Sequence, residues 1–110
     1  EIEGVNAAMV PPRDGTMACF YLYNAPEGTM KMISAQGEHC FAYQYDREVF
    51  PSQWYFASYG QFRDHYTAIL EPASAMPVSV NEAAALEQCS VLEPGGEIKT
   101  LVVIYAGVKR

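Results

Sequence analysis

The feature that most constrains this chain is a succession of short apolar and aromatic segments separated by turn residues. Apolar and polar positions alternate within these segments, which is typical of β-strands rather than helices. The pattern therefore predicts an all-β fold, an antiparallel β-sandwich or barrel rather than alternating βαβ units. The segments expected to form strands are residues 17–23, 29–34, 39–46, 52–58, 66–71 and 97–106.

Chain length and local signals refine this expectation. A chain of 110 residues suits a single β domain, with residues 1–16 as the loop that leads into the first strand. Pro72 is expected to end the strand before it, because proline has no N–H to give to a sheet. Only residues 81–87 have helical character, as one or two turns with Asn81 as the N-cap.

Composition and charge exclude several classes of function. A formal net charge of −6 argues against nucleic acid as a partner, because a phosphate backbone is bound by a basic surface. Half of the residues are apolar, which is too many for a disordered chain. No apolar run reaches the roughly 20 residues that a membrane-spanning helix needs, so no membrane partner is expected.

The cysteines and histidines do not form a recognisable metal site. Cys19, Cys40 and Cys89 are widely spaced and include no C-x-x-C pair, which favours reduced, packed thiols. His39 and His65 lie 26 positions apart without a nearby carboxylate cluster. A glycine-rich phosphate loop is also lacking. We therefore expect neither a metal nor another cofactor.

The second half of the chain carries an ordered set of motifs. It contains F-P-S-Q-W-Y-F from Phe50, then T-A-I-L-E-P, N-E-A-A-A-L and L-E-P-G-G-E-I, and an apolar strand that closes on Gly107. This order resembles the C-terminal part of galactose mutarotase-like proteins, especially their aldose 1-epimerase-like branches. The resemblance covers roughly residues 17–108 and is strongest over 50–107. The turn before the last strand departs from the family pattern by one extra glycine.

This resemblance implies a fold, a substrate class and a base. Members are larger antiparallel β supersandwiches that bind or epimerise hexoses, so the chain would be the C-terminal part of such a sandwich. The position matching the family's general base is Glu71. The family's acid histidine belongs to an N-terminal half that this sequence does not contain, which leaves open whether the chain is an enzyme.

The chemistry of epimerisation suits Glu71. Mutarotation needs a base for the anomeric hydroxyl proton and an acid for the ring oxygen. Glu71 follows Ile69 and Leu70, and partial burial at the end of an apolar strand makes a carboxylate more basic. The alternative is a solvated carboxylate, or one that holds a neighbouring loop.

Further candidates for contacts with a sugar have structural alternatives. Trp54 offers a flat ring for a pyranose and an indole N–H, or it fills the core beside Phe56. Tyr43 and His39 lie on one aromatic face of their strand and are also plausible core residues. Arg63 and His65 belong to a polar loop that could meet a hydroxyl or an acid group, or simply be solvated.

Two other readings of the function stay open, and one physical expectation accompanies all of them. The chain could be a non-catalytic carbohydrate-binding β-sandwich, or a cupin-like barrel that keeps one histidine in G-E-H-C-F-A-Y. In the mutarotase-like and carbohydrate-binding readings its ligand is a small-molecule carbohydrate. The segments 17–23 and 98–106 are apolar on both faces, more than one sheet covers. The chain is therefore expected to pack against another β segment, either a missing N-terminal half or a second copy.

Overall fold

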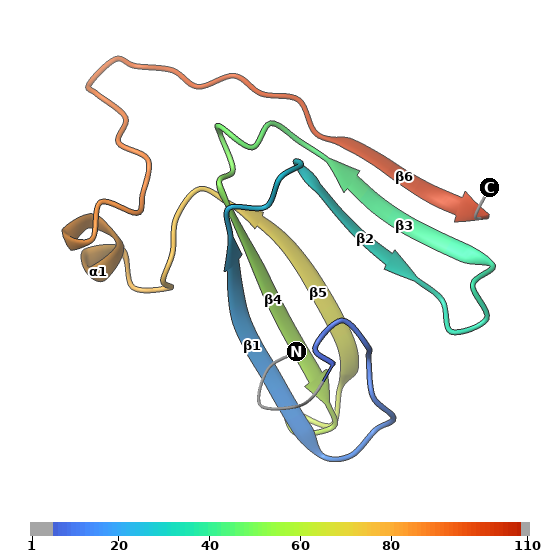
Figure 1. The fold of residues 1–110 in the computed structure, drawn as a ribbon. Coiled ribbons are helices and arrows are strands. Elements are labelled where there is room, and N and C mark those ends of the chain that lie inside the picture. The colour runs from blue at the N-terminus through green and yellow to red at the C-terminus, as the bar shows by residue number, and fades with distance from the viewer. Residues whose placement is uncertain (1–5, 109–110) are drawn as a thin grey trace. The chain divides into compact units, whose positions relative to one another are not determined.

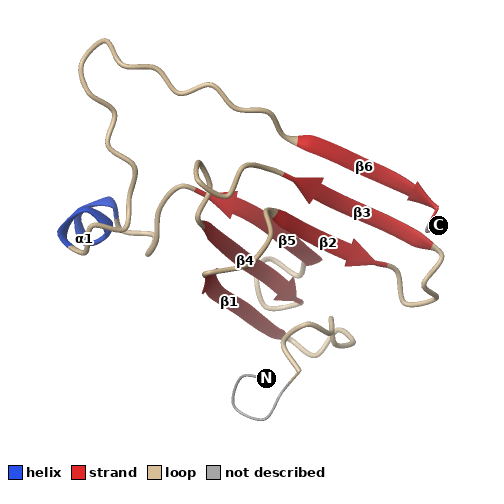
Figure 2. Ribbon diagram, turned by 45° about the horizontal axis from the view of Figure 1, so that its top comes forward, coloured by secondary structure: helices blue, strands red, loops and turns tan. Residues whose placement is uncertain are grey.

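The computed structural model describes residues 6–108, and its regular secondary structure is six strands and one short helix joined by loops (Figures 1 and 2). Within this range the all-β expectation is confirmed, and the strands form two three-stranded antiparallel sheets, ordered β1-β4-β5 and β2-β3-β6. The elements are β1 (Thr16–Tyr23), β2 (Thr29–Ile33), β3 (His39–Gln44), β4 (Ser52–Tyr59), β5 (Tyr66–Ala73), α1 (Val80–Ala85) and β6 (Val103–Val108).

The sheet β2-β3-β6 is built on the hairpin of its first two strands. Gly37 turns the chain with a φ of +73°, a conformation that glycine adopts without strain. The antiparallel register then pairs Met30 with Tyr43 and Lys31 with Ala42. β6 joins the other side of β3, with Ala106 opposite Phe41 and Ile104 opposite Tyr43. β3 is therefore the central strand of this sheet.

The sheet β1-β4-β5 has β4 at its centre. Six of the eight β4 residues are buried, and the two half-buried ones are Trp54 and Phe56, which lie on one face of the strand. Phe20 of β1 stacks on Tyr55 of β4 at 4.7 Å between ring centroids. Aromatic and β-branched residues favour such pleated, buried positions, which is why this segment forms the best-packed strand.

The chain divides into two compact units. The first comprises residues 6–20 and 55–69, and the second residues 21–54 and 70–108. The expectation of a single β domain stays a prediction. The buried apolar residues of the two units are Met30, Tyr45, Tyr55, Ala57, Tyr59 and Ala83.

Several predicted boundaries were wrong. Strand β5 continues through Pro72 to Ala73, because it is an edge strand, where a missing N–H leaves no ladder partner unpaired. Helix α1 begins one residue before Asn81, and its N-cap is Ser79, whose hydroxyl accepts from the Glu82 N–H at 3.4 Å. The last strand begins at Val103 rather than at residue 97, and it ends at Val108, two residues beyond the predicted end.

The two most apolar strands are largely exposed within this chain. In β1, Met17, Leu22 and Tyr23 are 43, 45 and 65% exposed, and in β6 every residue except Gly107 is exposed. Both strands are edges with one neighbour each in their sheets, so this chain covers them incompletely. Among residues 6–108, no helix has the length and apolarity needed to cross a membrane.

Candidate functional site

Trp54 is held in a fixed position within the second unit. Its indole Nε1 donates to the Ala75 carbonyl at 2.7 Å. The ring of Tyr21 packs edge-on against it, with centroids 5.2 Å apart and planes at 66°. The Tyr21 hydroxyl in turn accepts from the Val78 N–H at 3.3 Å. The half-buried indole is thus anchored on its polar edge, and its N–H is already used.

The hairpin of β4 and β5 sets the position of Glu71. The Gly60 N–H donates to the His65 carbonyl at 3.0 Å, and the rings of Tyr59 and Tyr66 lie 6.4 Å apart across the two strands. Continued through two strands of equal length, this register places Glu71 opposite Trp54. Directly opposite residues share one face with Cβ atoms about 5 Å apart. Both Trp54 and Glu71 are half-buried, and the hairpin register is expected to bring them to one face.

Tyr43 and His39 occupy β3, also in the second unit. Tyr43 is half-buried and meets Phe41 edge-on, with centroids 5.0 Å apart. His39 is exposed at the start of the strand, and its backbone N–H donates to the Ser34 hydroxyl at 3.1 Å. The two residues lie on one face of β3, as their spacing predicts. Their contacts are those of strand packing and a strand-start turn.

Arg63 and His65 lie on the loop between β4 and β5, in the first unit, and both contact Phe62. The Arg63 guanidinium carbon lies 5.6 Å from the centroid of the Phe62 ring. The His65 ring stacks on the same phenyl at 6.4 Å and 29°. All three side chains are exposed. The six predicted site residues are consequently divided between the units, with Arg63 and His65 in one and the other four in the second.

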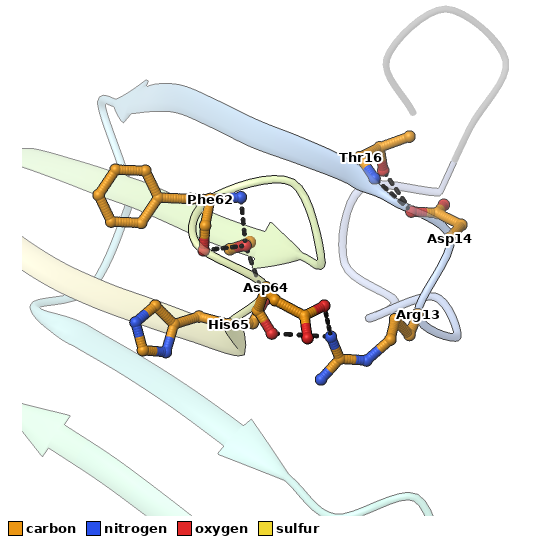
Figure 3. A network of polar contacts seen from close by, with 7 residues as sticks. Arg13, Asp14, Thr16, Phe62, Asp64 and His65 are labelled. Atoms are coloured by element: carbon orange, nitrogen blue, oxygen red, sulfur yellow. Dashed lines mark hydrogen bonds and ion pairs between the residues drawn. The ribbon is translucent and has the colours of Figure 1, made fainter.

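The same loop is braced by the residues that precede β1 (Figure 3). The Arg13 guanidinium donates to the Asp64 carbonyl at 2.7 Å and forms an ion pair with the Asp64 carboxylate. It also lies 5.6 Å from the centroid of the Tyr66 ring. The Ser58 hydroxyl completes the brace by accepting from the Phe62 N–H and donating to the His65 carbonyl.

Asp14 turns the chain into β1 beside this brace. The Thr16 hydroxyl and the Thr16 N–H both donate to its carboxylate (Figure 3). These two hydrogen bonds hold the pKa of Asp14 below its usual value. The arrangement is an Asx turn that ends the leading loop, so the carboxylate has a local structural role.

Buried hydroxyl and amide groups make two further networks around β4. The Tyr55 and Tyr59 hydroxyls are hydrogen-bonded at 2.7 Å in the first unit. Burial raises the pKa of Tyr55, and the hydrogen bond with Tyr59 raises it further. In the second unit the Gln53 amide donates to the Thr29 carbonyl at 3.1 Å and to the Tyr45 hydroxyl. These contacts fix the strands and leave no buried side-chain polar atom unpaired among the described residues.

Metal ligands do not converge in the part of the chain that the structure describes. Residues 6–108 contain no group of three histidine, cysteine or acidic side chains close enough to hold an ion. The cupin-like reading, which needs such a group, gains no support. Cys19, Cys40 and Cys89 are free thiols, and Cys19 is exposed rather than packed.

Comparison with known proteins adds no family. No family model matches the chain, and neither a curated protein nor a solved structure matches it. The resemblance to mutarotase-like proteins therefore stays a prediction that depends on the motifs alone.

The residues that hold Trp54 and the β4–β5 loop in place could not be identified from the sequence. No motif singles out Tyr21, although it packs against Trp54, and the sequence around Arg13 indicates only a turn. Arg13 and Asp64 are 51 positions apart, and no sequence pattern links them. The pairing of β1 with β4 is what brings such distant residues together. Knowledge of the strand order is the one signal that could have found them.

Proposed function

We propose that this chain binds a hexose or a related carbohydrate on the face of β4 and β5 that carries Trp54 and Glu71. The observation that supports this is the anchored, half-buried indole of Trp54; the hairpin register is expected to place the half-buried Glu71 opposite it. A ring that is fixed before binding loses little conformational freedom when a ligand stacks on it, which favours affinity. The ordered motifs that resemble those of mutarotase-like proteins point to the same ligand class.

Each group has a distinct task in this proposal. The Trp54 ring stacks against the C–H face of the pyranose, since its N–H is already bonded to Ala75. The Glu71 carboxylate accepts hydrogen bonds from sugar hydroxyls, which are strong because the acceptor is charged. The Tyr21 hydroxyl accepts from Val78 and keeps its own proton available as a donor. Tyr43, His39, Arg63 and His65 are not needed for this minimal surface.

Catalysis is a further step of the same proposal. As a general base, Glu71 would take the proton from the anomeric hydroxyl, and ring opening would need an acid at the ring oxygen. The family resemblance assigns that acid to a histidine of an N-terminal half. A non-catalytic carbohydrate-binding domain uses the same two residues without the proton transfer, so binding is the property to test first.

The test is a titration of the chain with hexoses, hexose phosphates and uronic acids, followed by tryptophan fluorescence. Trp54 is the only tryptophan, so the signal reports this surface alone. We expect saturable binding that Glu71→Gln weakens at least about tenfold, the loss of one charged hydrogen bond. Glu82→Gln, an exposed carboxylate on α1, is the matched control and should bind like the wild type.

Two results would contradict the proposal. One is a flat response to every sugar from a chain whose circular dichroism shows it to be folded. The other is an equal loss of affinity in Glu71→Gln and Glu82→Gln. If binding is seen, exchange between anomers measured by NMR distinguishes an epimerase from a binding domain.

A further inference from the structure

The segment that ends in β6 is unusually exposed for its composition. Every residue from 90 to 106 is exposed within this chain. Leu101 is 77% exposed, Ile104 59% and Val103 50%. Isolated exposed apolar residues are common, but a continuous apolar stretch of this kind marks an interaction site.

The free edge of β6 determines what can cover it. β6 pairs with β3 on one side only, so the backbone N–H and C=O groups of its other side have no strand partner in the described sheet. Such a row of groups is a template on which another strand can pair. Two of the other edge strands carry residues that oppose strand addition: β2 has the exposed Lys31, and β5 has Pro72. β6 has no such residue.

Strand β6 is also shorter than the strand that the sequence predicts over residues 97–106. Apart from Lys99 and Thr100, every residue from Ile98 to Ala106 is apolar or aromatic, yet the regular strand begins at Val103. Residues 97–102 have the pattern of a strand and no strand partner within the described chain. A partner along the free edge would supply the missing ladder and extend the strand to the predicted length.

We propose that a second copy of this chain pairs with β6, antiparallel and around a two-fold axis at Val103. This register places Ile98 opposite Val108 of the other copy, and Val102 opposite Ile104. The paired segment of eleven residues, 98–108, is about 37 Å long, against about 20 Å for β6 alone. An antiparallel strand pairs with its own copy in this closed, symmetric way because both surfaces are the same.

Charge explains why a second copy is tolerated at this edge. The chain carries a net charge of −6, so two copies repel each other at most places on their surfaces. Residues 100–108 carry no charged side chain. Lys99 already pairs with Glu97 at 2.8 Å and lies opposite Gly107 in the proposed register. No like charges meet along the seam formed by the two copies of residues 98–108.

The test is the oligomeric state of the full chain by sedimentation velocity over a range of concentrations. We expect a dimer of about 24.4 kDa, twice the 12.2 kDa of one chain. Leu101→Lys should weaken the dimer at least about tenfold, since a charge enters an apolar seam. Leu101 lies outside β6, so its replacement leaves the pairing with β3 intact. Val91→Lys is the matched control, because Val91 is also 77% exposed but lies outside the seam.

Hydrogen exchange distinguishes strand pairing from other contacts. The backbone amides of residues 98–102 should gain protection with rising concentration in the wild type and not in Leu101→Lys. A monomer at all concentrations, open-ended assembly instead of a dimer, or equal effects of Leu101→Lys and Val91→Lys would overturn the proposal. So would a dimer whose new protection falls on β1, the other uncharged edge strand.

Discussion

Strands β4 and β6 are both rich in apolar and aromatic residues, but they differ in almost every other respect. β4 contains three polar residues that are buried, Ser52, Gln53 and Ser58, whereas β6 contains only apolar residues, a tyrosine and a glycine. Nevertheless β4 is buried and β6 is exposed. β4 has a strand on each side and β6 has one. Between these two strands, burial follows the number of neighbouring strands and not the hydrophobicity of the strand itself.

The comparison also teaches how polar groups are accommodated. Two polar side chains of β4 are tolerated because they have partners: Gln53 donates to Thr29 and Tyr45, and Ser58 donates to the His65 carbonyl. β6 has nothing polar to satisfy in its side chains apart from the Tyr105 hydroxyl, which donates to the Val108 carbonyl at 2.7 Å. The buried polar side chains of the central strand β4 need hydrogen-bond partners, whereas the edge strand β6 leaves apolar side chains exposed.

The largest expected effect separates two tyrosines, one from each strand. Tyr55→Ala should lower the free energy of unfolding by about 3–5 kcal/mol, because the buried ring stacks on Phe20 and its removal leaves a cavity. Tyr105→Ala should cost below about 1 kcal/mol, since this residue is 45% exposed. Urea unfolding followed by circular dichroism, at a concentration where the chain is monomeric, measures both. Equal losses would show that β6 is as well packed as β4.

A smaller effect is expected from the buried amide of β4. Gln53→Leu keeps the volume but deprives the Thr29 carbonyl and the Tyr45 hydroxyl of their donor, which should cost about 1–3 kcal/mol. Gln44→Leu, at the exposed end of β3, is the control and should change stability by less than about 0.5 kcal/mol. Urea unfolding curves of the two variants measure the difference. A neutral Gln53→Leu would mean that the network does not stabilise the second unit.

The smallest expected effect appears at alkaline pH. The pKa of Tyr55 is raised above its ordinary value of 10.0, so the folded chain keeps this proton where the unfolded chain loses it. The contribution of Tyr55 is therefore complete below about pH 10 and is lost as the pH rises further, by at most about 1.4 kcal/mol per unit. Urea unfolding between about pH 8 and 11 should show this decline, and Tyr55→Phe should flatten it. Tyr105→Phe, on the exposed strand, should leave the decline as in the wild type.

The parts of the fold that depend on local pattern could be predicted from the sequence. The segment 52–58 is a strand with Trp54 and Phe56 on one face, and β4 differs from it by a single residue. The turn at Gly37 and the hairpin that it joins follow from turn chemistry in the same way. Strand order could not be predicted, because the placement of β4 between β1 and β5 depends on contacts far apart in the chain.

The candidate site could also be predicted only where it depends on local sequence. Trp54 and Glu71 could be singled out individually, and their common face follows from the hairpin that joins their strands. The anchoring of Trp54 by Tyr21 and Ala75 could not be anticipated, since each partner comes from a different part of the chain. The strand predicted over 97–106 is only partly formed, which is the discrepancy that led to the proposed dimer.

The order of the strands has a consequence for biosynthesis. β1 is synthesised before its neighbour β4, which is complete only at residue 59. At about 5–20 residues per second, the ribosome leaves β1 without its partner for about two to seven seconds. The hairpin of β2 and β3 needs no such delay, since its strands follow one another directly. The hairpin of β2 and β3 can therefore pair while β1 still waits for β4.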